Sequence, residues 1–129
     1  MRGNMKKIGI IGAMELEVET LKSKMEVKST SKKARMEFFE GTLNGVEVVI
    51  VRSGIGKVNA GMCTQILSDL FGVTHIINTG VAGSLNAAID IGDIVVSTEV
   101  LQHDVDATNF GYQLGEIPQI GTLTFPADE

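Results

Sequence analysis

The sequence KIGIIGAMELEVETL, residues 7–21, joins an apolar run to a carboxylate-rich one at a Gly-Ala pair. Its apolar start contains Ile8, Ile10 and Ile11 with little polar alternation, which is typical of a strand covered on both faces in a parallel sheet. Gly12 then permits a tight turn, and a carboxylate-rich helix follows directly. A buried strand that turns at once into a helix indicates an α/β protein.

The helix after Gly12 is expected to carry one buried stripe. At 100° per residue, the apolar side chains on that stripe are Met14, Val18, Leu21 and Met25. Glu15 and Glu19 lie away from the stripe, toward water, whereas Glu17 flanks it one turn past the strand. We therefore expect Glu17 to face the cleft at the carboxyl end of the first strand, where open α/β sheets bind their ligands.

Composition limits the class of protein. The chain has 129 residues with 43% hydrophobic content, enough for one soluble domain over residues 1–129. A net charge of −5 argues against nucleic-acid binding, which needs a concentrated basic face. The basic residues between positions 28 and 35 are expected to lie in a solvated loop. They are Lys28, Lys32, Lys33 and Arg35.

Cellular context is read from cysteine usage and hydropathy. A single cysteine, Cys63, excludes an internal disulfide. No apolar run approaches the roughly 20 residues that span a bilayer, and the start of the chain shows no signal-peptide pattern. We therefore expect a cytoplasmic protein without a membrane partner.

A hairpin is predicted in the first half of the chain. Residues 35–43 are rich in strand-forming side chains, and the apolar run 46–51 follows after Asn44 and Gly45. Asn-Gly between two such runs is the strongest short hairpin signal, because both residues tolerate positive φ. Together with the buried parallel strands, this antiparallel pair predicts a mixed, mainly parallel twisted sheet with flanking helices.

A second turn, Ser53-Gly54-Ile55-Gly56-Lys57, opens another helix. Its predicted buried face repeats every four residues, and further apolar residues widen it. The face consists of Val58, Met62, Ile66 and Leu70, widened by Cys63, Leu67 and Phe71. Cys63 is accordingly predicted to be a core residue and not a nucleophile. The turn could hold an anion at the helix N-terminus, but it lacks the spacing of a phosphate loop or a dinucleotide fingerprint.

Residues 73–78 are predicted to form another buried strand, which runs into the small-residue turn 79–84, TGVAGS. Turns that follow two parallel strands would meet at one cleft. Small residues there either serve tight turning or let a flat ligand approach the backbone. His75, inside the apolar strand, is interpreted as a structural histidine.

The last third of the chain is predicted to be β-rich and then turn-rich. Residues 91–101 read as a long strand, followed by Gln-His-Asp-Val-Asp at 102–106. A metal site there is disfavoured, because side chains on one extended segment alternate between faces. From residue 107 onward turns dominate, and the apolar Phe110, Tyr112 and Ile117 suggest a subunit interface.

Five ordered blocks carry a family resemblance. They are GIIGAMELEVETL, SGIGKVNA, INTGVAGSL, IGDIVVS and HDVDATNFGYQLGEIPQ. Together they resemble the amino-terminal half of the 5′-methylthioadenosine/S-adenosylhomocysteine nucleosidase family, in the nucleoside phosphorylase superfamily, from residue 5 onward. The resemblance implies a nucleoside phosphorylase-like fold and hydrolysis of the N-glycosidic bond with release of adenine. It implies no cofactor and no metal.

The resemblance also implies roles for individual residues. Glu17 matches the family's acid that handles the attacking water. Residues matching the lining of the ribose and base pocket are Met14, Ile55, Val81, Ala82 and Gly83. Phe110 and Pro118 match positions that reach into the partner's pocket in the family's homodimer.

Two departures from the family pattern matter. Val81 stands where many relatives have serine, so a hydroxyl contact is lost there. The family's ribose-binding Met-Glu motif and the Asp that protonates adenine belong to its carboxyl-terminal half, so the 129-residue chain alone is expected to be weakly active or inactive. The alternatives are a purine nucleoside phosphorylase and a non-catalytic folding and dimerisation half. The carboxylate at position 17 argues against the phosphorylase, because it would repel a phosphate dianion.

Overall fold

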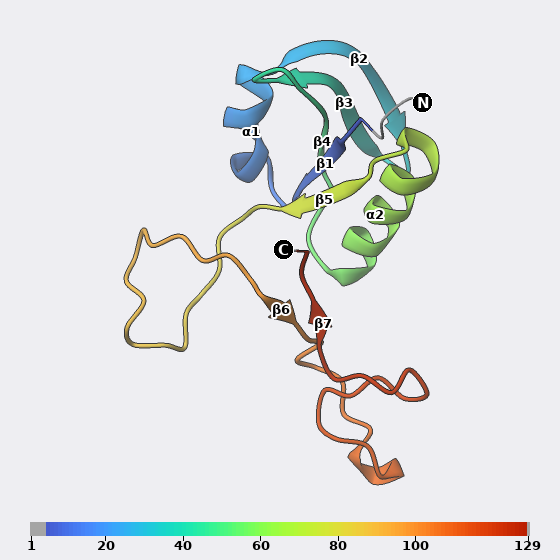
Figure 1. The fold of residues 1–129 in the computed structure, drawn as a ribbon, viewed down its shortest axis with the longest axis vertical. Helices are drawn as coiled ribbons and strands as arrows, with labels where there is room; N and C mark the ends of the chain where they lie inside the picture. The colour runs from blue at the N-terminus through green and yellow to red at the C-terminus, as the bar shows by residue number, and fades with distance from the viewer. Residues whose placement is uncertain (1–4, 129) are drawn as a thin grey trace. The chain divides into compact units, whose positions relative to one another are not determined.

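The computed structural model describes residues 5–128 and divides the chain into two compact units, Met1–Gly83 and Ser84–Glu129 (Figure 1). The first unit contains a five-stranded sheet and two helices, and the second contains a short two-stranded sheet. The single domain expected over residues 1–129 stays a prediction.

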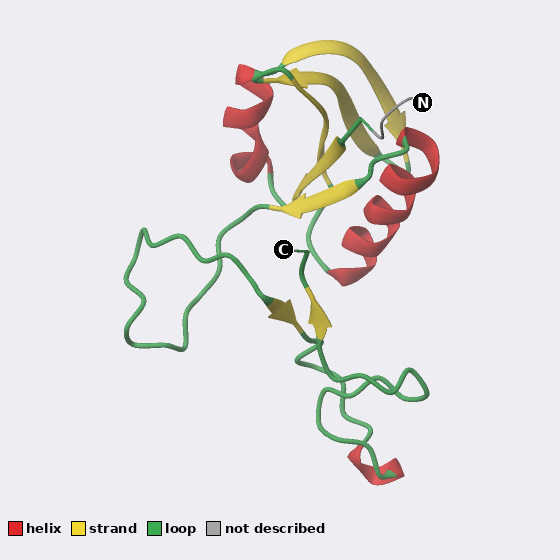
Figure 2. Ribbon diagram, viewed as in Figure 1, coloured by secondary structure: helices red, strands yellow, loops and turns green. Residues whose placement is uncertain are grey.

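In the first unit, three consecutive strands lie between the two helices, with one further strand before the first helix and one after the second (Figure 2). Its elements are β1 (Lys7–Gly12), α1 (Glu15–Lys24), β2 (Glu26–Lys33), β3 (Met36–Leu43), β4 (Val46–Arg52), α2 (Lys57–Phe71) and β5 (His75–Asn78). The strand order in the sheet is β2-β3-β4-β1-β5. Strand β1 pairs in parallel with β4 and β5, and β3 pairs antiparallel with β2 and β4. Only β3 therefore opposes the other four strands of this sheet, which confirms the mixed, mainly parallel sheet.

The predicted hairpin is confirmed and has an additional neighbour. Leu43 faces Val46 across a two-residue turn in which Asn44 and Gly45 have φ of 49° and 81°. The expectation of a solvated loop carrying the basic cluster is wrong, because Glu26–Lys33 forms β2 along β3. The polar sequence of β2 did not indicate a strand. Because β2 lies at the end of the sheet with most side chains exposed, it needs no apolar run.

Two apolar clusters lie on opposite faces of the sheet, each beneath one helix. The cluster under α1 contains Ile10, Val18, Met25, Val48 and Ile50. The cluster under α2 contains Ile11, Met36, Phe38, Val49, Val51, Cys63, Leu67 and Phe71. Strand β1 contributes Ile10 to one cluster and Ile11 to the other, as expected for a strand covered on both faces. The core position predicted for Cys63 is confirmed, since its side chain is fully buried.

The buried faces of α1 and α2 differ in part from the apolar stripes that the sequence predicted. Val18 and Met25 are buried, but Met14 precedes α1 as its N-cap and is 37% exposed. In α2, the four-residue repeat that packs is Cys63, Leu67 and Phe71, whereas Val58 and Leu70 of the predicted stripe are exposed. Neighbouring stripes of an apolar helix have the same period, so the sequence does not tell which of them is buried; in the structure the buried stripe includes Phe71, which stacks on Phe38 of β3.

The predicted burial of the strand at 73–78 is also wrong. Strand β5 occupies His75–Asn78 at the end of the sheet, and Ile76 and Ile77 are exposed. Within the described residues β5 pairs on one side, with β1. A strand at a sheet edge can carry an apolar run without being covered, which the sequence pattern does not reveal.

The second unit is mostly irregular. It contains β6 (Glu99–Val100), the 3₁₀ helix η1 (Thr108–Phe110) and β7 (Phe125–Pro126), which pairs antiparallel with β6. The long strand expected over 91–101 is therefore wrong except for two residues. A strand needs a hydrogen-bonded neighbour, and the two-residue β7 is the neighbour that this unit provides among its described residues. Between residues 5 and 128, no helix is long and apolar enough to cross a membrane.

Candidate active site

Three strands of the first unit end at the same edge of the sheet. Because β1, β4 and β5 are parallel, the segments that follow them meet there. The backbone nitrogen of Ser53 donates to the carbonyl oxygen of Gly12 at 2.9 Å, and that of Thr79 donates to Ile11 at 2.9 Å. These bonds tie the turns after β4 and β5 to the end of β1. The prediction that the strand-end turns meet at one place is confirmed.

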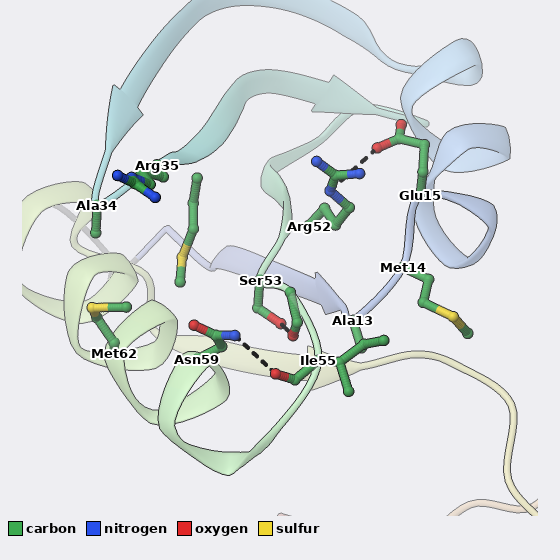
Figure 3. Close-up of a pocket in the computed structure, with 12 residues that line it drawn as sticks. Ala13, Met14, Glu15, Ala34, Arg35, Arg52, Ser53, Ile55, Asn59 and Met62 are labelled. Atoms are coloured by element: carbon green, nitrogen blue, oxygen red, sulfur yellow. Dashed lines mark hydrogen bonds and ion pairs between the residues drawn. The ribbon is translucent and has the colours of Figure 1, made fainter.

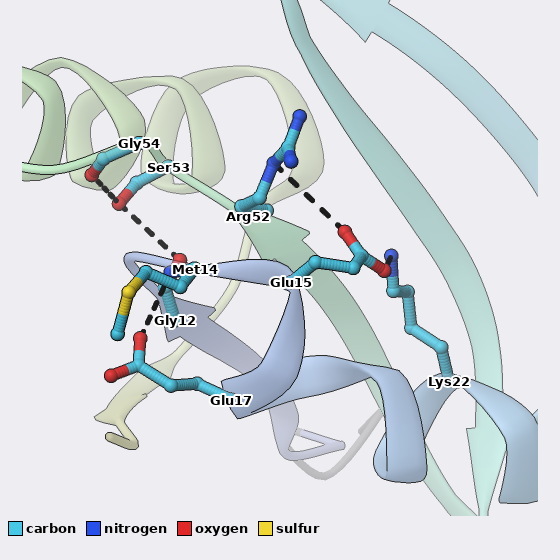
Figure 4. A network of polar contacts seen from close by, with 8 residues as sticks. All are labelled: Gly12, Met14, Glu15, Glu17, Lys22, Arg52, Ser53 and Gly54. Carbon is cyan, nitrogen blue, oxygen red and sulfur yellow. Dashed lines mark hydrogen bonds and ion pairs between the residues drawn. The ribbon is translucent and has the colours of Figure 1, made fainter. Parts of the chain in front are cut away.

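Glu17 lies at this junction, in the first turn of α1. The backbone nitrogen of Met14 donates to its Oε2 at 2.9 Å (Figure 4). The backbone nitrogen of Val81, in the turn after β5, donates to its Oε1 at 3.2 Å. One carboxylate therefore caps the start of α1 and holds the turn that follows β5.

The same hydrogen bonds set the charge of Glu17. Backbone donors at Met14 and then Val81 lower the pKa of this carboxyl from its ordinary value of 4.5, with a smaller contribution from Ala13. Glu17 is therefore ionised at neutral pH. A carboxylate offers about four acceptor positions, so a water or a ligand hydroxyl can still bind to it.

Two glycines leave space for the Glu17 side chain. A Cβ atom on Gly80 would lie 2.6 Å from Oε1 of Glu17. A Cβ atom on Gly12 would lie 3.0 Å from Cβ of Glu17 and 2.6 Å from Val18. The small residues at both strand ends therefore leave room for this carboxylate and for the helix that carries it.

A cleft of about 550 Å³ opens between the end of β1, the turn after β4, the start of α2 and the turn between β2 and β3 (Figure 3). It is lined by Ala13, Met14, Glu15, Ala34, Arg35, Met36, Arg52, Ser53, Gly54, Ile55, Asn59 and Met62. Asn59 stabilises the turn after β4, because its Nδ2 donates to the carbonyl oxygen of Ile55 at 2.8 Å.

The structure brings several of the predicted site residues together. Met14 and Ile55 both line the cleft. Glu17, which was expected to face the cleft, is not among its lining residues; it accepts hydrogen bonds from the backbone nitrogens of Met14, at the edge of the cleft, and of Val81. Ala82 and Gly83 follow Val81 in the same exposed turn.

Phe110 and Pro118 belong to the second unit. Phe110 ends η1 and is 84% exposed, and Pro118 is exposed in a later turn. Both side chains are thus accessible to another molecule.

Sequence reasoning missed the charged part of the cleft. Arg52 is the last residue of β4, so its place at the carboxyl edge could have been read from the strand pattern. Arg35 lies in the turn between β2 and β3 with a φ of 64°, and this turn was not predicted because β2 was missed. Glu15, expected to point to water, pairs with Lys22 and lies 3.9 Å from the Nε of Arg52.

The other candidate motifs have structural explanations. Gly54 and Gly56 adopt φ of 86° and 101°, so the Gly-x-Gly pattern is required by the turn itself. His75 is half-buried, and its Nδ1 lies 2.9 Å from Oγ1 of Thr74, which fits a structural histidine. Over residues 5–128, no three His, Cys, Asp or Glu side chains gather as metal ligands.

Comparison with known proteins adds independent information. Residues 7–129 match the phosphorylase superfamily. The chain is 52% identical over 124 residues to the 5′-methylthioadenosine/S-adenosylhomocysteine nucleosidase of Halalkalibacterium halodurans, covering 96% of this chain and 54% of the relative. The chain thus spans about half the length of the curated relatives it matches.

Two solved structures share the fold. The nucleosidase of Colwellia psychrerythraea, in complex with adenine, has a TM-score of 0.91 at 48% identity, covering 98% of this chain and 52% of that one. The nucleosidase of S. pneumoniae, with a transition-state inhibitor, has a TM-score of 0.89 at 41% identity, covering 95% and 53%. The sheet, its strand-end turns and these similarities lead to one conclusion: the chain belongs to the phosphorylase superfamily.

Proposed function

We propose that this chain is the water-activating half of a nucleosidase that cleaves the N-glycosidic bond of 5′-methylthioadenosine and S-adenosylhomocysteine. The observation that carries the proposal is the ionised Glu17, held beside the cleft by backbone nitrogens from two strand-end turns. Relatives about half identical to the chain are nucleosidases for these two compounds. One related structure holds adenine and another a transition-state inhibitor, which supports the same substrate class.

The reaction breaks the bond between ribose C1′ and the adenine nitrogen and forms a bond from C1′ to a water oxygen. Positive charge develops on the ribose as adenine departs, and a nearby carboxylate stabilises that charge. Glu17 accepts a proton from the attacking water, while adenine gains a proton from a second acid. The resemblance assigns that acid to the family's carboxyl-terminal half.

A lowered pKa makes Glu17 a weak base, and this suits the proposed chemistry. An oxocarbenium-like centre is a strong electrophile, so water needs orientation more than it needs a strong base. The two backbone hydrogen bonds provide orientation, because they hold both carboxylate oxygens in place. Permanent ionisation also keeps the negative charge beside the ribose throughout the neutral pH range.

The proposal includes a homodimer. Exposed apolar side chains in the turn-rich segment support it, in particular Phe110 at 84% exposure together with exposed Pro118. In the family resemblance these positions reach into the partner's pocket. Chemical crosslinking and sedimentation of the purified protein test this part of the proposal, and a monomer at all concentrations would contradict it.

Phosphorolysis is the second candidate function, and the two arginines of the cleft favour it. Arg35 and Arg52 line the cleft, and guanidinium groups are the usual ligands of a phosphate dianion. Against it, Glu15 pairs with Lys22 and lies near Arg52, and Glu17 is ionised, so negative charge also borders the site. Hydrolysis therefore remains the function that we propose.

One assay separates the candidates. Adenine release from each nucleoside is measured for the chain alone and for the chain combined with a separately expressed carboxyl-terminal half of the Halalkalibacterium halodurans relative, with and without inorganic phosphate. Hydrolysis predicts release in phosphate-free buffer and free ribose as the co-product. Dependence on phosphate would establish the phosphorylase, and no release from either preparation would favour a non-catalytic folding and dimerisation half.

A further inference from the structure

The turn after β4 presents Ile55 to the cleft from between two glycines. Gly54 and Gly56 have φ of 86° and 101°, a region that glycine reaches without steric cost. Glycine also has the largest backbone freedom of any residue, so this turn has little stiffness of its own. The side chain of Ile55 is 74% exposed, so packing within the first unit does not hold it. Contacts to the backbone of the turn therefore set the position of Ile55.

Asn59, in the first turn of α2, makes one of these contacts. Its Nδ2 donates to the carbonyl oxygen of Ile55 at 2.8 Å (Figure 3). The next bond in the same pattern runs between backbone atoms, from the nitrogen of Ala60 to the carbonyl oxygen of Gly56 at 3.1 Å. The Asn59 side chain thus extends the helical pattern by one residue, to a carbonyl group that precedes the helix.

Ser53 holds the other side of the turn. This residue is 6% exposed, and its Oγ donates to the carbonyl oxygen of Gly54 at 2.8 Å (Figure 4). Its backbone nitrogen donates to the carbonyl oxygen of Gly12, so the start of the turn is tied to the end of β1. Two successive carbonyl groups, those of Gly54 and Ile55, are therefore each held by a side chain.

The absence of a side chain at residue 54 gives the Asn59 amide its place. A Cβ atom on Gly54 would lie 3.0 Å from Nδ2 of Asn59, which is closer than an ordinary van der Waals contact. The amide thus occupies the space beside the turn that a side chain at residue 54 would need.

We propose that Asn59 is a positioning residue for substrate binding, whose hydrogen bond holds the turn so that Ile55 packs against the nucleoside. This inference rests on the proposed function. The proposed chemistry takes place at Glu17, which is held by the backbone nitrogens of Met14 and Val81 and not by this turn. An apolar contact remote from the reacting atoms stabilises the bound substrate and the transition state equally. Loss of the Asn59 bond should therefore raise KM and leave kcat unchanged.

The test measures kcat and KM for 5′-methylthioadenosine in the preparation that releases adenine. Asn59→Ala removes the amide, and Asn59→Asp keeps its size but has no N–H group to donate at neutral pH. We expect KM to rise about fivefold in both variants, the size that one neutral hydrogen bond allows. Gln65→Ala is the matched control, because Gln65 also donates from its amide on α2, to Asp69 at 2.7 Å, but does not line the cleft.

A second comparison asks whether Asn59 acts through Ile55. In an Ile55→Ala background, Asn59→Ala should have almost no further effect on KM, because the side chain that the turn presents is already removed. Thermal midpoints of all variants report folding separately. A role in helix stability alone would move the midpoint and leave KM unchanged.

Each outcome decides the matter. A higher KM in both Asn59 variants but not in Gln65→Ala, absent in the Ile55→Ala background, supports the positioning role. Adenine release with an unchanged KM in both Asn59 variants overturns that role and leaves the nucleosidase intact. Multiplicative effects of the Asn59 and Ile55 substitutions overturn it as well, since Asn59 would then act independently of Ile55. No adenine release from the unaltered protein overturns the proposed function and the positioning role together.

Discussion

Glu17 and Val81 are joined by a hydrogen bond of 3.2 Å from the backbone nitrogen of Val81 to Oε1 of Glu17, although 64 residues separate them. The bond connects the helix that follows β1 to the turn that follows β5. It needs only the backbone of residue 81, so it does not depend on which side chain this position carries. The position of the catalytic candidate thus depends on two strand ends that lie side by side in the sheet.

Replacing Glu17 with Gln tests its proposed catalytic role. Glutamine keeps the size and helix propensity of the side chain but removes its charge, so turnover should fall by about 10²–10⁴-fold in the preparation that releases adenine. A small loss of stability is also expected, because the charged acceptor of the Met14 and Val81 nitrogens becomes neutral. Glu19→Gln, two residues further along α1 and exposed, is the control for both measurements. Equal turnover in Glu17→Gln and the unaltered protein would end the catalytic assignment.

Gly80→Ala tests whether the position of the carboxylate matters. The added Cβ atom would lie 2.6 Å from Oε1 of Glu17, so the carboxylate must move and its bond to Val81 must lengthen. Activity should fall on the order of 10²-fold, whereas stability should change little because only the end of a side chain is displaced. In a Glu17→Gln background the same substitution should have almost no further effect on turnover. Independent, multiplicative losses would show that Gly80 acts in another way.

Stability should depend on pH through Glu17. Its pKa in the folded state lies below its ordinary value of 4.5, so the folded state binds fewer protons than the unfolded state near that pH. The ionised carboxylate therefore contributes stability above pH 4.5, and this contribution is lost as the pH falls through the folded-state pKa. The difference in thermal midpoint between the unaltered protein and Glu17→Gln should be constant from about pH 6 to 8 and shrink below about pH 4.5. A difference that grows on acidification would contradict the assignment.

Cys63 should be unreactive while the protein is folded. Burial raises the pKa of its thiol to about 11, and the side chain is fully covered between α2 and the sheet. At pH 8 the reactive thiolate is therefore scarce as well as inaccessible. Labelling by an aromatic disulfide reagent should be slow in native buffer and accelerate in denaturant, with a rate set by opening of the core. Immediate stoichiometric labelling in native buffer would show that the core beneath α2 is open.

Gly41→Ala should weaken the pairing of β2 with β3. A Cβ atom at residue 41 would lie only 1.9 Å from the carbonyl oxygen of Glu26, so β2 and β3 would have to separate locally. Overpacking of this kind typically costs about 1–3 kcal/mol. Gly61→Ala is the control, because a Cβ there meets open space on α2 and alanine favours the helix by about 1 kcal/mol. Chemical denaturation of both variants measures the two opposite changes.

Features that depend on neighbouring residues could be read from the sequence. The Asn44-Gly45 turn is one of them, because positive φ at two successive residues is a local property. The apolar strand β1 and the small residues at its end are another, and together with the following glutamates they indicated an acid at the strand's carboxyl edge. The five sequence blocks likewise led to the correct superfamily.

Which apolar side chains are buried, and which distant residues meet, depends on the tertiary structure. Several stripes of α2 are apolar, and the one that packs against the sheet carries Cys63, Leu67 and Phe71. Strand β2 forms from a polar segment because β3 offers it backbone partners, and β5 stays exposed because it lies at the end of the sheet. The bond from the backbone nitrogen of Val81 to Glu17 joins residues that are 64 positions apart in the chain. Such contacts depend on strand order and register, which a local pattern of side chains does not specify.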